Sequence, residues 1–138
     1  MLDKHQIIIS KKINKFQLLK FKMSKQYDLE ERTFQFAKNV SIYIKKFSKT
    51  ISNIEYGKQV VRSSGSVGAN YIEANEALSK KDFIMRIKIC RKEAKESAYW
   101  LRLIGETNGE KYTEGGRKLF KEATELKKIF SSILEKSK

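Results

Sequence analysis

Residues 62–74 of this chain, RSSGSVGANYIEA, are rich in glycine and serine, yet they continue an apolar pattern at helical spacing. A strongly helical run, KEAKESAYWL, follows at 92–101. Glycine inside a helix costs about 1 kcal/mol relative to alanine, so it is tolerated mainly where another backbone must approach closely. The stretch therefore predicts a helix packed tightly against a neighbour, in preference to a phosphate-binding loop.

The composition of the whole chain favours long helices. Its 138 residues suffice for one domain with a core, and they include no proline and only seven glycines. No apolar run approaches the roughly 20 residues that span a bilayer, and no signal segment is evident. The single cysteine, Cys90, excludes an internal disulfide and suits a reducing compartment. We therefore expect a cytoplasmic protein with no membrane partner.

Positive charge is the strongest compositional feature. Thirty Lys and Arg residues against sixteen Asp and Glu give a net charge of +14. A surplus of this size favours polyanionic partners such as RNA, DNA or an anionic membrane surface. The alternative is that the chain is simply a basic protein without such a partner.

The first 26 residues differ from the rest of the chain. They carry seven lysines and one acidic residue, a local charge of +6, which leaves +8 for the remainder. Two interpretations are open: a basic tail that orders on a polyanion, or a segment upstream of a true start at Met23. We expect an N-terminal extension over 1–26 and one folded domain over 27–138.

Four amphipathic helices are expected in that domain, over about 28–47, 52–78, 79–104 and 114–135. The first three begin with an N-cap residue followed by an acid three positions later: Asp28 and Glu31, Ser52 and Glu55, Ser79 and Asp82. Short links between long helices predict an all-α, antiparallel up-down four-helix bundle.

Each expected helix carries a row of residues at spacings of three, four or seven, which defines an apolar seam. The first seam is Leu29, Phe36, Val40, Tyr43 and Phe47. On the second helix, the residues on one side are Ile54, Val61, Gly68, Ile72 and Asn75. The third seam is Phe83, Ile87, Cys90, Ala94, Ser97, Leu101 and Ile104. The fourth is Leu119, Ala123, Leu126, Phe130 and Ile133.

The third helix has a basic side opposite its seam. Within about 80° of one another, at 100° per residue, it places Lys81, Lys88, Lys92, Lys95, Tyr99 and Arg102, with no acidic residue among them. We call these six residues the basic ridge. A cationic row with an aromatic side chain suits contact with phosphates, whereas the alternative is an ordinary solvated lysine face.

A second apolar strip lies between the ridge and the seam and consists of Met85, Ile89, Trp100 and Leu103. One interpretation is an interface with another subunit, in which the small residues of the second helix provide the matching surface. That interface would include Arg62, Ser64, Gly65 and Gly68. The other interpretation is that the strip widens the core of a single bundle.

The residues of this chain argue against catalysis, and no cofactor or metal site is expected. The only histidine is His5, which excludes Ser-His-Asp arrangements and the Glu-x-x-His pairs of di-iron bundles. The acid pairs Glu73 with Glu76 and Glu93 with Glu96 suit ion pairs between helices. No Gly-Lys-Ser/Thr follows residues 65–68, so these glycines do not form a Walker loop.

Three stretches of the chain resemble the bacterial four helix bundle protein family. They are QVVRSSGSVGANYIEA at 59–74, SKKDF at 79–83 and KEAKESAYWL at 92–101, and LEERTFQFA at 29–37 also fits. The family includes proteins encoded within intervening sequences of 23S ribosomal RNA genes, and the accessory variability protein of diversity-generating retroelements is related to it. The likeness extends from residue 27 to about 135.

This resemblance implies a ring of up-down bundles, typically a homopentamer, without an established enzyme activity. It also implies that Arg62, Ser64, Gly65, Gly68, Asn70 and Glu73 serve the fold and the ring. The retroelement relatives bind nucleic acid and a reverse transcriptase through basic surfaces. We therefore expect a non-enzymatic nucleic-acid-binding oligomer with little sequence specificity; the alternative is a scaffold that docks a partner protein such as a reverse transcriptase.

Overall fold

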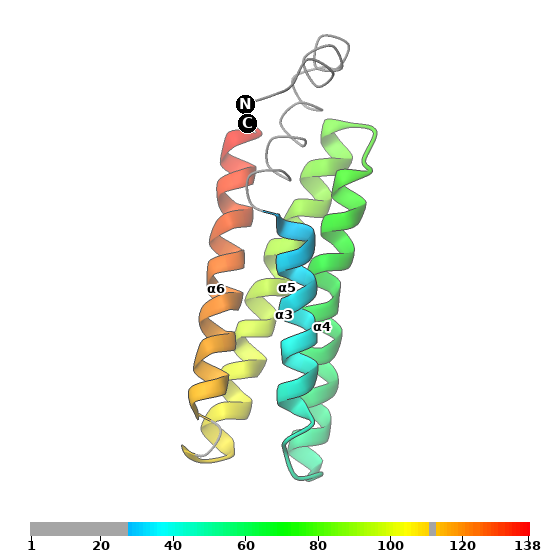
Figure 1. Cartoon of the computed structure of the whole chain (residues 1–138). Coiled ribbons are helices and arrows are strands. Elements are labelled where there is room, and N and C mark those ends of the chain that lie inside the picture. The colour runs from blue at the N-terminus through cyan, green and yellow to red at the C-terminus, as the bar shows by residue number, and fades with distance from the viewer. Residues whose placement is uncertain (1–27, 111–112) are drawn as a thin grey trace.

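The computed structural model describes residues 28–110 and 113–138, so the predictions made for residues 1–26 lie outside the described part. The described chain forms four helices, α3 (Leu29–Ile44), α4 (Ile51–Asn75), α5 (Lys80–Thr107) and α6 (Thr113–Lys136). They lie side by side in one elongated bundle (Figure 1). The number and order of the helices agree with the sequence prediction.

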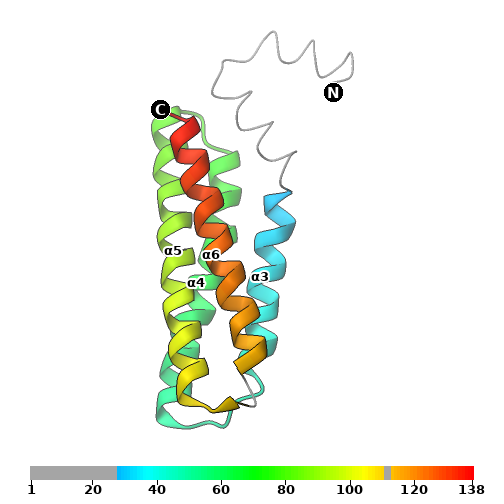
Figure 2. The same cartoon turned by 90° about the vertical axis from the view of Figure 1, so that its left-hand side faces the viewer.

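Each helix packs beside its neighbours in the sequence. Contacts are most extensive between α5 and its two neighbours α4 and α6, whereas α3 packs on α4 and more lightly on α6. The chain reverses direction at each link, as Figures 1 and 2 show. Arg32 of α3 also binds Glu122 of α6 through two hydrogen bonds of 2.9 and 2.7 Å. The arrangement is that of the predicted up-down bundle.

One of the three predicted capping interactions is present. The Ser79 hydroxyl accepts a hydrogen bond of 3.1 Å from the Asp82 backbone N–H. Asp28 is the N-cap residue of α3, as predicted, but its φ is +44° and its side chain accepts no hydrogen bond from an N–H group of the first turn, so the predicted capping interaction is absent. The Ser52 cap was wrong, since α4 begins earlier and Thr50 accepts from the Asn53 N–H at 3.1 Å.

Three of the four predicted seams are confirmed. Every seam residue of α3 and α5 is buried, including Phe47 just beyond the end of α3, and on α6 only Leu119 is partly exposed. These residues meet in one core and exclude water from the bundle axis.

The row of residues predicted as the seam of α4 does not face the core. Ile54, Val61 and Ile72 are 41%, 45% and 50% exposed. The buried residues of α4 form a different row, which is Gly57, Val60, Ser63, Ser64, Val67, Tyr71 and Ala74. Small and hydroxyl-bearing residues make up much of that row, so apolar periodicity alone did not identify it.

The close approach predicted from the glycine-serine stretch occurs at Gly68, where α4 meets α3. A Cβ added at Gly68 would lie 3.0 Å from Thr33 Oγ1 and 3.3 Å from Thr33 Cβ. Thr33 is buried and its hydroxyl donates a 2.6 Å hydrogen bond to the Leu29 carbonyl, so it has little freedom to move away. Gly65, one turn earlier, faces open space.

We predict opposite effects on stability at the two glycines. Gly68→Val should destabilise the bundle by about 1–3 kcal/mol, the usual cost of overpacking. Gly65→Ala should stabilise it by up to about 1 kcal/mol through helix propensity. Urea unfolding followed by circular dichroism measures both, and equal stabilities for the two variants would contradict the assignment of the close contact.

Candidate functional site

The six ridge residues all lie on the exposed outer side of α5. The buried seam on the opposite side sets this orientation, because α4 and α6 both pack against it. At 1.5 Å per residue the ridge extends about 32 Å along the helix. The structure therefore brings together the cationic side chains that the sequence assigned to one surface.

Most of the charge on the ridge is uncompensated. Within the described residues, Lys81, Lys88 and Lys95 form no ion pair. Lys92 Nζ lies 3.9 Å from Glu93 Oε1, at the outer limit of an ion pair. The row of ridge residues itself contains no acidic residue from Lys81 to Arg102; Glu93 lies beside it, on the buried side of α5.

An acidic residue does meet the ridge just beyond its end. Arg102 Nε donates a 2.6 Å hydrogen bond to Glu106 Oε2, one turn further along α5. Both side chains are largely exposed, so this pair is worth little in stability. It lowers the net positive charge at the C-terminal end of the ridge and leaves the two Nη groups of Arg102 available.

The N-terminal half of the ridge borders a shallow groove with a volume of about 740 Å³. Its lining combines lysines with apolar side chains: Lys80, Lys81, Asp82, Ile84, Met85, Lys88, Ile89 and Lys92. Met85 is 47% exposed. Lys80 and Ile84 were not predicted to belong to this surface. Their spacing of four residues, which places both on one side of a helix, is the signal that could have identified them.

Only part of the second apolar strip is exposed to solvent. Trp100 stacks on Tyr56 of α4, with ring centroids 5.9 Å apart and an interplanar angle of 29°. Its Nε1 atom is buried and forms no hydrogen bond with any described residue. Trp100 thus widens the core of its own bundle, which was one of the two interpretations, while Met85, Ile89 and Leu103 keep exposed surface.

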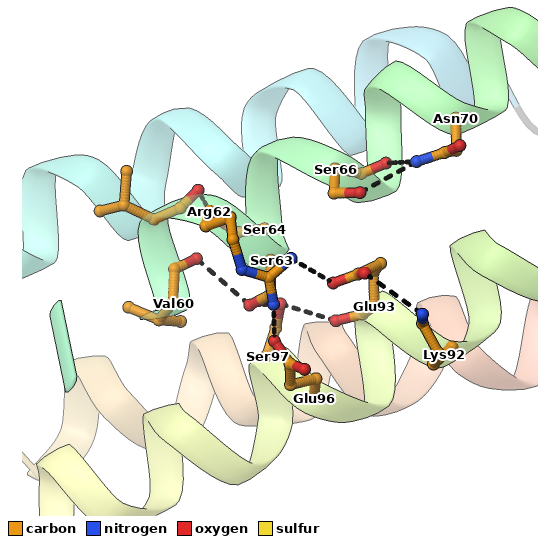
Figure 3. Close-up of polar contacts among 11 residues, drawn as sticks. Val60, Arg62, Ser63, Ser64, Ser66, Asn70, Lys92, Glu93, Glu96 and Ser97 are labelled. Atoms are coloured by element: carbon orange, nitrogen blue, oxygen red, sulfur yellow. Dashed lines mark hydrogen bonds and ion pairs between the residues drawn. The ribbon is translucent and has the colours of Figure 1, made fainter. Parts of the chain in front are cut away.

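A polar cluster joins α4 to α5 beside the ridge (Figure 3). Arg62 reaches from α4 to two carboxylates of α5: Nη1 lies 3.3 Å from Glu93 Oε2, and Nη2 binds Glu96. The Glu93 side chain is only 7% exposed, and Arg62 is its nearer cationic partner, since Lys92 lies 3.9 Å away. The predicted ion pairing of Glu93 and Glu96 between helices is confirmed. No such pair involves Glu73 or Glu76 within the described part.

Two buried serines extend this cluster into the core. The hydroxyls of Ser63 and Ser97 are 2.8 Å apart, and Ser97 Oγ also donates to the Glu93 carbonyl at 2.8 Å. Buried hydroxyls need such partners, because an unsatisfied polar group costs about 1–3 kcal/mol. One serine of the glycine-serine stretch, Ser63, therefore helps to join α4 to α5.

The four α4 residues predicted for a subunit interface differ in how accessible they are in the structure. Ser64 is buried and its hydroxyl bonds to the Val61 carbonyl at 3.3 Å, and Gly68 contacts Thr33. Arg62 is half exposed and engaged with α5. Only Gly65 of this group lies on the surface with open space above it.

The described residues offer no reactive thiol, no cluster of metal ligands and no membrane-spanning helix. Burial raises the pKa of the Cys90 thiol to about 12, and the thiol donates to the Val67 carbonyl at 3.4 Å. No three His, Cys, Asp or Glu side chains of residues 28–110 and 113–138 cluster where they could hold a metal ion. Among the same residues, no helix is both long and apolar enough to cross a membrane.

Comparison with known proteins identifies relatives of this chain. The family model described as 23S rRNA-intervening sequence protein matches residues 25–132. A solved structure from Bacteroides thetaiotaomicron, described as a protein with unknown function from the S23 ribosomal protein family, is 32% identical. The match covers 77% of this chain and 97% of that one, with a TM-score of 0.67. No curated protein matches the sequence.

We predict that Arg62→Met destabilises the bundle by about 1–3 kcal/mol, because the buried Glu93 carboxylate loses its partner. Lys58→Met is the matched control, since Lys58 also lies on α4 but pairs with Glu55 where both side chains are exposed. Its effect should stay below about 0.5 kcal/mol. Chemical unfolding measures both variants, and equally small losses would show that Arg62 does not support Glu93.

Proposed function

The chain belongs to the 23S rRNA-intervening sequence protein family, and we propose that it is a non-enzymatic protein that binds nucleic acid, RNA or DNA, through the basic ridge. The observation that carries this proposal is the unpaired charge of Lys81, Lys88 and Lys95 on one exposed helix face. Ammonium groups with no carboxylate partner are free to replace the counterions around phosphates.

The geometry of the ridge favours contact with the phosphate backbone. It is a single row along α5, flanked by the partly buried strip residues Ile89 and Leu103. The lysine ammonium is a point charge without the planar fork that pairs with base edges. Contacts of this kind fix position along a strand and carry little sequence information.

The groove at the N-terminal half of α5 favours a second candidate function, the docking of a partner protein. Met85 and Ile89 supply apolar contact there, and four lysines surround them. An acidic amphipathic segment of another protein would complement this surface. Capture of one defined partner that survives high salt and nuclease treatment would favour this function over nucleic-acid binding.

We also propose that the chain assembles into a homo-oligomeric ring, for which the family resemblance suggests a pentamer. Support comes from the outward side of α4, where Ile54, Val61 and Ile72 are exposed beside the uncrowded Gly65. Met85, Ile89 and Leu103 on α5 of the next copy are the proposed counterpart, so this contact and the docking of a partner protein on Met85 and Ile89 are alternatives. Two different faces that meet in this way generate a ring when the rotation closes.

Neutralising Lys88, Lys92 and Lys95 to Gln should weaken binding and flatten its salt dependence. Each phosphate contact contributes about 0.7–0.9 to the slope of log K against log salt, so the slope should fall by about 2–3. Fluorescence anisotropy over a salt series, with structured RNA, duplex DNA and heparin, measures both quantities.

The matched control for this triple variant carries the same charge change elsewhere. Lys38, Lys121 and Lys136 are exposed on α3 and α6, and their replacement by Gln should change the slope far less. Equal effects of the two triple variants would show that binding depends on net charge alone. Equally weak binding of the unmodified chain to all three polyanions would contradict the proposed function.

For assembly, Val61→Glu should shift the protein to a smaller species, because a carboxylate would be buried in the proposed interface. Ile42→Glu is the control, since Ile42 is similarly exposed but lies on α3. Light scattering coupled to size-exclusion chromatography gives the masses. A single-chain mass for the unmodified protein would overturn the proposed ring.

A further inference from the structure

We infer that the nucleic acid bound by this chain is single-stranded, and that the Tyr99 ring stacks on one of its unpaired bases. This inference rests on the proposed function and names the ligand class of the same surface. It makes Tyr99 the element of the ridge that distinguishes one form of nucleic acid from another.

Tyr99 is 60% exposed and is the only aromatic residue of the ridge. Along the helix axis, Lys95 lies about 6 Å before it and Arg102 about 4.5 Å after it. Lys95 has no ion pair among the described residues, and the Nη groups of Arg102 are not used in its bond to Glu106. A base over Tyr99 would therefore have cationic groups on both sides for its flanking phosphates.

The ring of Tyr99 contacts one aromatic ring directly, and that ring contacts a third. Tyr99 contacts Trp100 edge to face, with centroids 5.0 Å apart and an interplanar angle of 81°. Trp100 in turn stacks on Tyr56 of α4. A ring packed against a neighbour on one edge has less conformational freedom to lose when a ligand binds. The three rings thus form a platform whose outermost member is exposed between two cations.

The form of the nucleic acid follows from what an aromatic ring can contact. In a duplex the faces of the bases are stacked on one another, so a protein ring on the outside meets only backbone and groove edges. A single strand exposes base faces, and stacking on an aromatic side chain is worth about 1–3 kcal/mol per base. Lysines alone would bind either form, whereas Tyr99 adds affinity only for the single strand.

An isolated exposed tyrosine needs no functional explanation. Tyr99 differs because an exposed ring, packed on one edge against Trp100, lies between Lys95, which has no ion pair among the described residues, and Arg102, whose guanidinium is paired with Glu106 only through Nε. The exposed Phe120 offers a comparison, since it lies outside the ridge and has no aromatic contact with another described residue.

The test uses the full chain and labelled 20-nucleotide probes: oligo-dT, oligo-rU, a DNA duplex and an abasic strand that has phosphates but no bases. Tyr99→Ala should weaken binding to oligo-dT and oligo-rU about 5-fold or more, as expected for one lost stacking contact. Binding to the duplex and the abasic strand should change less than about 2-fold, because phosphate contacts remain. Tyr99→Trp should restore single-strand affinity, and Phe120→Ala is the control.

The only tryptophan of the chain provides a second readout. A base stacked on Tyr99 should change the fluorescence of the adjoining Trp100, and the abasic strand should not. Circular dichroism and light scattering confirm that Tyr99→Ala keeps its fold and its mass.

The possible outcomes separate this inference from the proposed function. If the unmodified chain binds neither these probes nor structured RNA, the proposed function fails and this inference with it. If the lysine triple variant weakens binding but Tyr99→Ala affects all probes equally or none, the proposed function stands and this inference is overturned. The oligo-dT and oligo-rU probes also show whether DNA or RNA is preferred.

Discussion

The apolar seam on the inner side of α5 is the constraint on which the rest of the structure depends. Its seven residues, from Phe83 to Ile104, are all buried, and both α4 and α6 pack against the helix that carries them. A shift of one residue in the sequence would turn that helix by 100° and bring lysine side chains into the core. The burial of the seam therefore fixes which residues form the outer surface.

Polar contacts add a preferred alignment to this packing. Apolar side chains of similar size can interlock in more than one register, whereas the hydroxyls of Ser63 and Ser97 meet in a single alignment of α4 and α5. The salt bridge of Arg62 to Glu93 requires the same alignment. Because Glu93 follows Lys92 directly, the contact that aligns the two helices also borders the candidate binding surface.

Sequence reasoning succeeded where hydropathy and burial coincide, as on α5, and failed where they diverge. On α4 the exposed side carries Ile54, Val61 and Ile72, while Ser63 and Ser64 are buried. The pattern of large apolar residues therefore pointed to the wrong side. The capping hydrogen bond expected at Asp28 is absent for another reason, since this residue has a left-handed backbone with a φ of +44°, which the capping pattern in the sequence does not reveal. The ridge was predictable from charge spacing, but the stacking of Trp100 on Tyr56 was not, because it joins two helices.

The burial of Cys90 has a practical consequence for the study of this protein. A thiol with a pKa of about 12 is almost entirely protonated at neutral pH, and the thiolate is the nucleophilic form. Because Cys90 is also buried, we expect the folded chain to react little with maleimides and other alkylating reagents. A cysteine introduced on any exposed helix face would be the single reactive position, so spectroscopic labels can be attached to the native sequence without first removing Cys90.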